Sequence, residues 1–553
     1  MQSFKAHIIT LLQKETSLPE ISLEVPPNPD LGDFAFPCFS LSKQFKKAPQ
    51  QIAQELALKI PADELISSIK PTGPYLNFFV NKKRLANETL QNALSQKDRY
   101  GSSATGKGKK ILVEHTSINP NASTHVGRAR NALIGDSIVR ILRFQDYEVD
   151  VHYFVNDVGK QIAMLVLGTQ GKGKIGFNDL LNLYIDINKR SESDENIEKQ
   201  AFELLHRLEK GDPDVRSQFH GIVKTCIEGQ GKILEELDIH YDSYDYESEF
   251  LWNKKTEEVL HLLDKTGKLF VDDNNRKVMN LEGYGLGMES PVFVMTRADG
   301  TSLYGLRDIA YTIEKMKQGE NIVVLGEDQK LYFEQIAAVM KELRLTSPRA
   351  VHYSFVLLKE GKMSTRQGNV VLLSEFMHEI VSKANEEIES RYGKRDEEAA
   401  KAIGYGALKY SILKVSSEKS VTFDLEQALS FEGDTGPYIQ YSYARIASIL
   451  RKHAKEIPGY DAGLLETPIE QKIIKQIANF PALLQKASED LHPHLIAVYL
   501  YELSQSFNEF YHAHEVLSAE EKVRDARLAL CMAVSQVLKN GLGLLGIGVL
   551  ERM

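Results

Sequence analysis

The chain has 553 residues, too many for one hydrophobic core, and its content of 42% hydrophobic and 26% charged residues is ordinary for a globular protein. No apolar run approaches the about 20 residues that a membrane span needs, and the net charge of −9 argues against a protein that coats nucleic acid indiscriminately, so we expect neither a membrane nor DNA as a partner. The cysteines Cys38, Cys226 and Cys531 form no CxxC pair, so we expect no structural zinc and a reducing, cytoplasmic compartment.

The first predicted domain spans residues 1–105. Apolar residues at helical spacing in MQSFKAHIITLLQKE predict an amphipathic helix rather than a signal peptide, APQQIAQELALKI predicts a second helix, and YLNFFVN predicts a strand. Lysines cluster at 43–47, 82–83 and 107–110, which fits contact with a polyanion, although ordinary solvated lysines are the alternative. The small-residue linker GSSATGKGKK marks the end of this domain.

A second predicted domain spans residues 106–375. The strand-like KILVEHT, the helical ARNALIGDSIVRILRFQ and the strand-like YEVDVHYFV form a strand–helix–strand unit, which predicts a parallel sheet. Residues at about 165–280 are charged and helical in pattern, and we expect them to be an insertion. The runs PVFVMT, NIVVLG and YSFVLL are rich in β-branched residues and predict further buried parallel strands.

Helical patterns dominate from about residue 370 onward. Residues 376–430 are predicted to form a connecting helical region, and residues 431–553 an all-helical bundle. The predicted fold class is therefore multidomain α/β, in which a Rossmann-like parallel-sheet domain carries an α+β N-terminal domain and an all-α C-terminal bundle.

Two polar stretches follow predicted strands and could hold phosphate. In INPNASTHVGRARNALIGD, His125, Gly127 and Arg128 stand where a strand ends and a helix begins, and a helix N-terminus favours phosphate. In EGKMSTRQGNVVLL, the cations Lys362 and Arg366 could close over a pyrophosphate. The first stretch is neither GxGxxG nor a P-loop, and either one alone could be a charged helix start or a surface turn.

Together, the two stretches resemble the signature motifs of class I aminoacyl-tRNA synthetases, His-x-Gly-His and Lys-Met-Ser-Lys-Ser. Arg128 stands in place of the second histidine, and Thr365 in place of the second lysine. The wider chain is similar to arginyl-tRNA synthetases from end to end. The similar stretches are NPDLGDFAF, GPYLNFFVN, YFVNDVGKQ, EGDTGPYIQYSYARI, FNEFYHAHEVL and GLGLLGIGVLERM.

The resemblance implies an arginine–tRNA ligase, which activates L-arginine with ATP to arginyl-adenylate and transfers it to the 3′ end of tRNA(Arg). Mg²⁺ would accompany ATP, since no protein cage for it is visible in the sequence. The catalytic residues implied are His125, Arg128, Lys362 and Arg366, and the ATP-binding residues are His125, Gly127, Arg128, Lys362, Met363 and Ser364. The resemblance also implies a monomer that needs tRNA before it activates arginine.

Arginine recognition is implied for Glu114, Asn119, Tyr304, Asp308 and Gln329. A guanidinium stays charged and favours planar carboxylate partners, and Tyr304 and Asp308 are four residues apart, so they could share a helix face. The resemblance places these two at the guanidinium, Asn119 and Gln329 near the α-amino group, and Glu114 at either end. Ordinary roles in ion pairs, turns, helix starts or the core are the alternatives.

Contacts with tRNA are implied at both ends of the chain: the N-terminal domain would touch the elbow of the tRNA and the bundle would bind the anticodon. Tyr438, Tyr441 and Tyr443 could stack on bases, or could simply pack where the bundle begins. Three other functions stay open at this point. They are a class I synthetase for another amino acid, a different nucleotidyltransferase, and a non-catalytic tRNA-binding paralogue, the last because Arg128 and Thr365 depart from the motifs.

Overall fold

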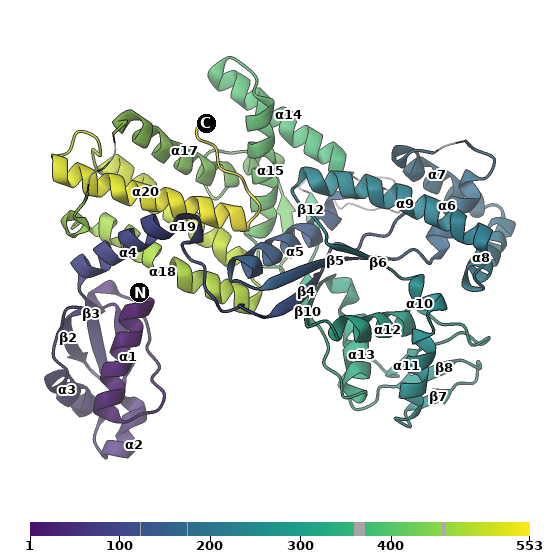
Figure 1. Cartoon of the computed structure of the whole chain (residues 1–553), viewed down its shortest axis with the longest axis horizontal. Coiled ribbons are helices and arrows are strands. Elements are labelled where there is room, and N and C mark those ends of the chain that lie inside the picture. The colour runs from purple at the N-terminus through teal and green to yellow at the C-terminus, as the bar shows by residue number, and fades with distance from the viewer. Residues whose placement is uncertain (122, 174, 359–370, 456, 458) are drawn as a thin grey trace.

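The structure of the chain is a computed structural model that describes residues 1–121, 123–173, 175–358, 371–455, 457 and 459–553. Its N-terminal part contains an antiparallel sheet of order β1-β3-β2 and lies at one end of the molecule (Figure 1). The elements of this part are α1 (Gln2–Thr16), β1 (Phe34–Pro37), α2 (Ser42–Phe45), α3 (Pro49–Lys59), β2 (Ile66–Thr72), β3 (Tyr75–Val80) and α4 (Lys82–Gln96). Phe4, Ile8 and Leu12 recur every four residues along α1 and are buried, which confirms the predicted amphipathic helix.

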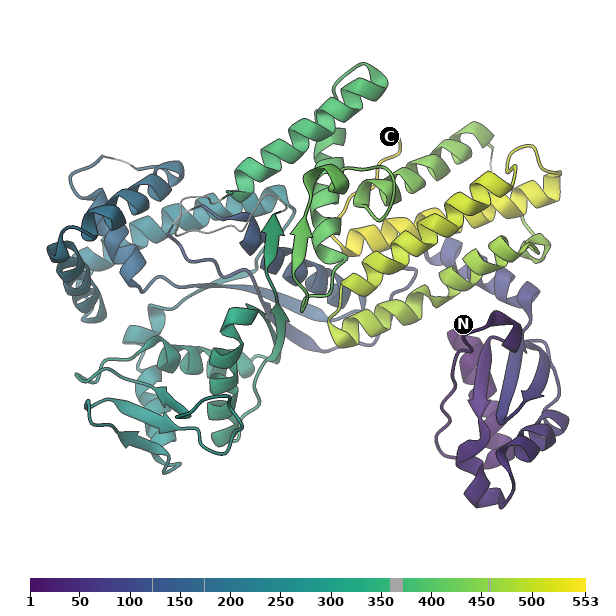
Figure 2. The same ribbon diagram turned by 180° about the vertical axis from the view of Figure 1, so that it is seen from behind.

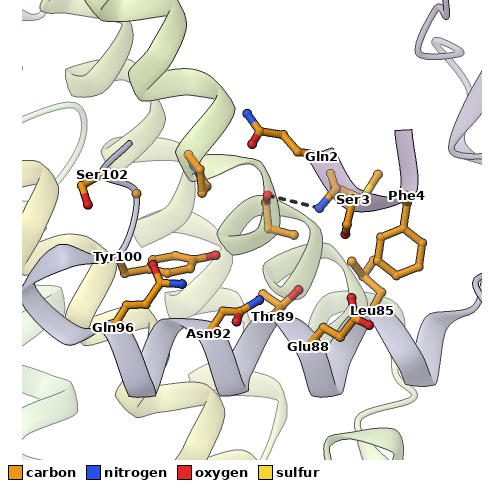
Figure 3. Close-up of a pocket in the computed structure, with 14 residues that line it drawn as sticks. Gln2, Ser3, Phe4, Leu85, Glu88, Thr89, Asn92, Gln96, Tyr100 and Ser102 are labelled. Carbon is orange, nitrogen blue, oxygen red and sulfur yellow. Dashed lines mark hydrogen bonds between the residues drawn. The ribbon is translucent and has the colours of Figure 1, made fainter. Parts of the chain in front are cut away.

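Helix α4 extends away from this sheet and packs against the C-terminal helices α18 (Pro468–Asp490) and α20 (Glu521–Leu544). A cavity of about 280 Å³ lies where α1, α4 and α18 meet (Figure 3). Beside it, Pro481 has no N–H to offer the carbonyl of Ile477, and the hydroxyl of Tyr100 donates to that carbonyl at 2.9 Å. The segment after α4 is therefore joined to helix α18 by a buried hydrogen bond as well as by packing.

The central sheet is parallel and has the strand order β11-β10-β4-β5-β6. Its strands are β4 (Lys110–Glu114), β5 (Glu148–Val155), β6 (Ser243–Tyr246), β10 (Glu320–Gly326) and β11 (Arg349–Tyr353). Helix α5 (Val126–Phe144) connects β4 to β5, which confirms the predicted strand–helix–strand unit. The helix approaches β4 so closely that a Cβ on Gly135 would lie 2.2 Å from the Cγ of His115, so glycine alone fits at that position.

Two of the runs predicted as parallel strands of this sheet lie elsewhere. PVFVMT contains β9 (Val292–Val294), but β9 pairs with β8 (Lys277–Asn280) in an antiparallel sheet of order β7-β8-β9. YSFVLL contains β12 (Val356–Leu358), which pairs with β13 (Val421–Phe423), and Figure 2 shows these two arrows side by side. The central sheet is instead completed by β11, just before β12. A short β-branched run predicts a strand but carries no information on its partner.

The range 165–280, expected to be a helical insertion, is helical only in its first part. Helices α6 (Lys160–Thr169), α7 (Phe177–Ser191), α8 (Glu195–Glu209) and α9 (Pro213–Glu236) lie together at the far end of the molecule from α1 (Figure 1). The chain then returns to the central sheet through β6. It continues into a small unit made of α10 (Glu249–Trp252), α11 (Lys255–Asp264), β7 (Leu269–Val271), β8, β9, α12 (Tyr304–Met316) and α13 (Lys330–Glu342).

The C-terminal part is helical, as predicted. Its helices are α14 (Leu373–Tyr392), α15 (Glu397–Leu413), α16 (Leu425–Ala428), α17 (Gly436–His453), α18, α19 (His494–Ala513) and α20. Buried Lys409 of α15 donates to the carbonyls of Leu237 and Gly546, at 2.6 Å each, and so joins α15 to the end of α9 and to the C-terminal tail. In the part of the chain that the structure describes, no helix is long and apolar enough to cross a membrane.

Candidate active site

The first motif lies at the carboxyl end of the parallel sheet, where β4 gives way to α5. His125 is the N-cap residue of α5, with extended backbone angles, and Gly127 and Arg128 lie in the first turn of the helix. The positive end of the helix dipole is therefore directed at this edge of the sheet. This is the edge where ligands bind in open parallel sheets, and the structure places His125, Gly127 and Arg128 together there.

Burial, and then the charge of Arg128, lowers the pKa of His125 to about 4. His125 is therefore neutral at pH 7, whereas the guanidinium of Arg128 remains charged. The two side chains offer different chemistry: His125 can donate or accept a hydrogen bond without bringing charge, and Arg128 supplies a fixed positive charge. The departure from the His-x-Gly-His pattern thus adds a cation beside a neutral imidazole.

The second motif lies outside the described residues, so the structure tests none of Lys362, Met363, Ser364 and Arg366. The residues that follow it are described and pair with the first motif. The N–H of Val126 donates to the carbonyl of Val371 at 3.2 Å, and the N–H of Leu373 donates to the carbonyl of Thr124 at 2.8 Å. The segment that carries the second motif therefore ends against the start of α5.

The residues before the second motif are also bonded to α5. Arg130 is completely buried, and its guanidinium donates to the carbonyls of Ser354 at 2.8 Å, Phe355 at 3.3 Å and Ser416 at 2.9 Å. Ser354 and Phe355 lead directly into β12, which ends at Leu358. One helix thus holds the chain on both sides of residues 359–370. No local sequence pattern indicates this role of Arg130, because its partners are 224 to 286 residues away.

The residues predicted to bind the guanidinium, Tyr304 and Asp308, lie in the first turns of α12. Asp308 is half-buried, and one of its carboxylate oxygens, Oδ2, accepts a hydrogen bond from the hydroxyl of Tyr332 on α13. The ring of Tyr304 is 56% exposed and lies 5.4 Å, centroid to centroid, from the ring of Tyr332. The structure therefore brings Tyr304 and Asp308 together on one end of α12, with Tyr332 as an additional member of the group.

Glu247 lies near Asp308, and Asp157 lies near Glu247 in turn. Glu247 follows β6, is 2% exposed, and accepts a hydrogen bond at 2.6 Å from Nε of Arg307, the residue before Asp308. Asp157 follows β5 and accepts the N–H of Ser248 at 2.8 Å. Burial is the largest influence on all three, raising the pKa of Asp308 to about 6, that of Glu247 to about 7, and that of Asp157 to a lesser degree. A cation that entered this region would stabilise the charged carboxylates.

Glu114 also contributes to this acidic region, but it already has a cationic partner. The buried Nζ of Lys315 pairs with its carboxylate, and the same Nζ lies 4.2 Å from the ring centroid of Tyr311. Lys315 stands seven residues after Asp308, two helical turns along α12, so the helical period could have identified it from sequence. Its charge lowers the pKa of Asp308, whereas the charge of Glu114 raises it.

Asn119 and Gln329 lie at the exposed margin of the site. Asn119 follows β4, and its side chain donates to Gln161 at 3.4 Å while its carbonyl accepts from Gln230 at 3.2 Å. Gln329 follows β10, and its side chain donates to Asp328 at 3.3 Å. Since β4 and β10 are neighbouring parallel strands, both residues leave the same edge of the sheet.

A second hollow region lies in the helical part, with a volume of about 1090 Å³. Tyr438 and Tyr441 of α17 line it, and the ring of Tyr441 makes an edge contact with Phe431 at 6.2 Å and lies under the guanidinium of Arg445 at 4.8 Å. Tyr443 is 9% exposed and bonds through its hydroxyl to Glu551 at 3.1 Å. Tyr438 and Tyr441 therefore share this groove, whereas Tyr443 is not among the residues that line it.

Known proteins resemble the chain along its whole length. Three family profiles match: "Arginyl tRNA synthetase N terminal domain" at residues 1–80, "tRNA synthetases class I (R), catalytic domain" at 89–425, and "DALR anticodon binding domain" at 439–553. The arginine–tRNA ligase of Methanocella arvoryzae is 39% identical over 538 residues, covering 93% of this chain and 92% of that protein. The arginine–tRNA ligase of Streptococcus equi is 36% identical, covering 95% and 94%.

Solved structures are similar over the same extent. The arginyl-tRNA synthetase of Thermus thermophilus superposes with a TM-score of 0.85 at 29% identity and covers 100% of both chains. The arginyl-tRNA synthetase of Plasmodium falciparum gives a TM-score of 0.80 at 20% identity with 99% of both chains covered, which shows the fold. Within the described residues, no group of three or more potential ligand side chains is arranged to hold a metal ion.

Proposed function

The chain belongs to the arginyl-tRNA synthetase family and is an arginine–tRNA ligase, and from this premise we propose how its residues divide the reaction. In the first step the arginine carboxylate attacks the α-phosphorus of ATP, and the bond to the β-phosphate breaks, which gives arginyl-adenylate and pyrophosphate. In the second step a hydroxyl of the terminal ribose of the tRNA attacks the arginyl carbonyl, and AMP leaves. The protein mainly positions these groups and stabilises the charge that develops.

The start of α5 is proposed to bind ATP. Gly127 lets the main chain approach the nucleotide, neutral His125 donates a hydrogen bond to the α-phosphate, and Arg128 adds a fixed charge beside it. Lys362 and Arg366 would hold the β- and γ-phosphates, with Met363 and Ser364 as further ATP contacts. Mg²⁺ would enter bound to ATP. What supports this arrangement is that both flanks of residues 359–370 are hydrogen-bonded to α5.

The acidic region around Asp308 is proposed to bind the arginine side chain. The observation that carries this assignment is the half-buried carboxylate of Asp308 beside the exposed ring of Tyr304 and the hydroxyl of Tyr332. Burial raises the pKa of Asp308, and a guanidinium, which stays charged on burial, would relieve that penalty. Asp308 would pair with the guanidinium and Tyr304 would cover it. Glu114 takes part as half of its ion pair with Lys315, and Asn119 and Gln329 would contact the α-amino end.

The tRNA contacts are proposed from the two outer parts of the chain. Tyr438 and Tyr441 would stack on anticodon bases in the groove of about 1090 Å³, where Arg445 can add a cation–π contact. Tyr443 is left out of this proposal because its hydroxyl bonds to Glu551. We propose that the chain works as a cytoplasmic monomer. Its proposed domains are residues 1–105 for the elbow of the tRNA, 106–375 for catalysis, 376–430 as a connection, and 431–553 for the anticodon.

Replacement of His125 tests the ATP assignment. In His125→Ala, arginyl-adenylate formation in the presence of tRNA(Arg) should fall by about 10²–10³, the usual loss when one well-placed donor to a transition state is removed. The circular dichroism spectrum should be unchanged, because the N-cap of α5 has no side-chain hydrogen bond to lose. His220→Ala, at an exposed position of α9, is the matched control and should keep full activity. Near-normal adenylate formation in His125→Ala would overturn the assignment.

A further inference from the structure

We propose that Tyr332 is a positioning residue for arginine recognition, whose hydroxyl holds the Asp308 carboxylate in the orientation that receives the guanidinium. The proposal rests on the arginine site described above and goes beyond it. Tyr332 lies on α13 and Asp308 on α12, so the hydrogen bond between them also ties together the two helices that carry this site.

The ring of Tyr332 packs against two other aromatic rings. It lies 5.7 Å from the ring of Phe293 in an edge-to-face arrangement at 80°, and 5.4 Å from the ring of Tyr304. Aromatic contacts of this kind hold a ring in one orientation. The hydroxyl is therefore held where it meets Oδ2 of Asp308, and the position of the carboxylate follows from the packing of the aromatic cluster.

The hydroxyl of Tyr332 is the donor in this bond. Burial and the negative charge of Asp308 raise the pKa of Tyr332 well above its ordinary range, so the phenol keeps its proton. A carboxylate offers about four lone-pair directions over its two oxygens, and this bond occupies one of them on Oδ2. Oδ1 and the second direction of Oδ2 remain for a guanidinium, which binds a carboxylate best through two parallel hydrogen bonds.

The same bond helps to keep Asp308 ionised. Its charged neighbours come from three elements: Arg307 and Lys315 from α12, Glu114 from β4, and Glu247 after β6. Burial raises the pKa of Asp308 and Glu114 acts in the same direction, whereas the hydrogen bond from Tyr332 is the largest influence that lowers it. Without the hydroxyl, Asp308 should take up a proton at a higher pH, and a neutral acid cannot form the ion pair with arginine.

The test is Tyr332→Phe, which keeps the ring and removes the hydroxyl. Aminoacylation is measured with tRNA(Arg) present at pH 6.5 and pH 8.5. At pH 6.5 the KM for arginine should rise about threefold, since raising a pKa of about 6 by one unit lowers the ionised fraction of Asp308 from about three quarters to about one quarter at that pH. At pH 8.5 the rise should be clearly smaller, because Asp308 is then ionised in both proteins. The KM for ATP should stay within about twofold, and kcat within about threefold.

Tyr284→Phe is the matched control. The hydroxyl of Tyr284 also donates to a carboxylate on α13, that of Glu342, but Glu342 lies at the opposite end of the helix from Tyr332. This variant should leave the KM for arginine unchanged at both pH values. Thermal unfolding of both variants, followed by circular dichroism, checks that each one folds.

Two results would overturn the proposal. One is an unchanged KM for arginine in Tyr332→Phe at pH 6.5. The other is a rise in KM that is equal for arginine and ATP and equal at both pH values, because that would be a structural effect. Asp308→Asn, assayed in parallel, separates this proposal from the site on which it rests. If Asp308→Asn weakens arginine binding and Tyr332→Phe does not, the assignment of the arginine site is supported and the positioning role of Tyr332 is refuted. If neither does, the arginine site itself is wrong.

Discussion

Replacing Arg130 should disturb the second motif without changing any residue of that motif. The guanidinium of Arg130 donates to three main-chain carbonyls, those of Ser354, Phe355 and Ser416, at 2.8, 3.3 and 2.9 Å. In Arg130→Lys, the ammonium keeps the charge but cannot span all three, because it is a point donor on a flexible stem whereas the guanidinium is a rigid fork. We expect two carbonyls to lose their charged donor.

The cost can be estimated from those lost bonds. Each hydrogen bond to a charged donor contributes about 1.5–3 kcal/mol in a protein interior, so losing two should destabilise this region by about 3–6 kcal/mol. Because Ser354 and Phe355 lead into residues 359–370, part of that cost should appear as poorer positioning of Lys362 and Arg366 over ATP. Pyrophosphate exchange in the presence of tRNA(Arg) should therefore show a raised KM for ATP and a lowered kcat, with a much smaller change in the KM for arginine.

Arg143→Lys is the matched control for this experiment. Arg143 lies on the same helix, and its guanidinium bonds to the carbonyl of Val149 and to Asp242, but its side chain is 49% exposed and far along α5 from the first motif. The control should change neither KM. If Arg130→Lys also left the KM for ATP and the thermal stability unchanged, the idea that α5 anchors the second motif would be refuted.

Four further replacements follow from the site and from the contacts that support it. Arg128→His should restore the family motif, and retained exchange activity would show that the position needs a donor, whereas a large loss would show that it needs a fixed charge. Tyr441→Ala should raise the KM for tRNA(Arg) but not that for arginine, and Tyr443→Phe should change neither; equal effects would contradict the groove assignment. Burial lowers the pKa of Lys409 to about 8 in the folded chain, so the unfolded chain binds the extra proton. The stability of the wild type relative to Lys409→Met should therefore rise between pH 8 and pH 10, by up to about 2.7 kcal/mol, and a fall would contradict the sign.

Local pattern was enough to predict the parts of the fold that depend on one segment. The strand–helix–strand unit around α5, the amphipathic α1 and the helical C-terminal part are visible in apolar spacing alone. The strand with which a given strand pairs is not visible in apolar spacing. PVFVMT and NIVVLG look alike in sequence, yet β9 pairs within a small antiparallel sheet and β10 lies inside the central one. Pairing depends on residues far along the chain, which the local pattern does not contain.

The residues of the candidate site also divide into those that a local motif indicates and those that only the folded chain brings together. The motif resemblance identifies His125, Arg128, Tyr304 and Asp308, and the structure places them at the carboxyl edge of the sheet or at the start of α12. The residues that support them could not be found in that way. Tyr332 is 24 positions from Asp308, and Arg130 bonds across 224 positions or more. Such supporting contacts become visible only when the chain is folded.

The most direct test of the whole account is whether Asp308 serves arginine and not ATP. In Asp308→Asn the guanidinium would lose its ionic partner in a half-buried site, and breaking a buried ion pair costs about 3–5 kcal/mol. With tRNA(Arg) present, the KM for arginine should rise about 10²-fold or more, while the KM for ATP should stay within about threefold. Equal losses for arginine and ATP, or a normal KM for arginine, would contradict the division of the site between α12 and the start of α5.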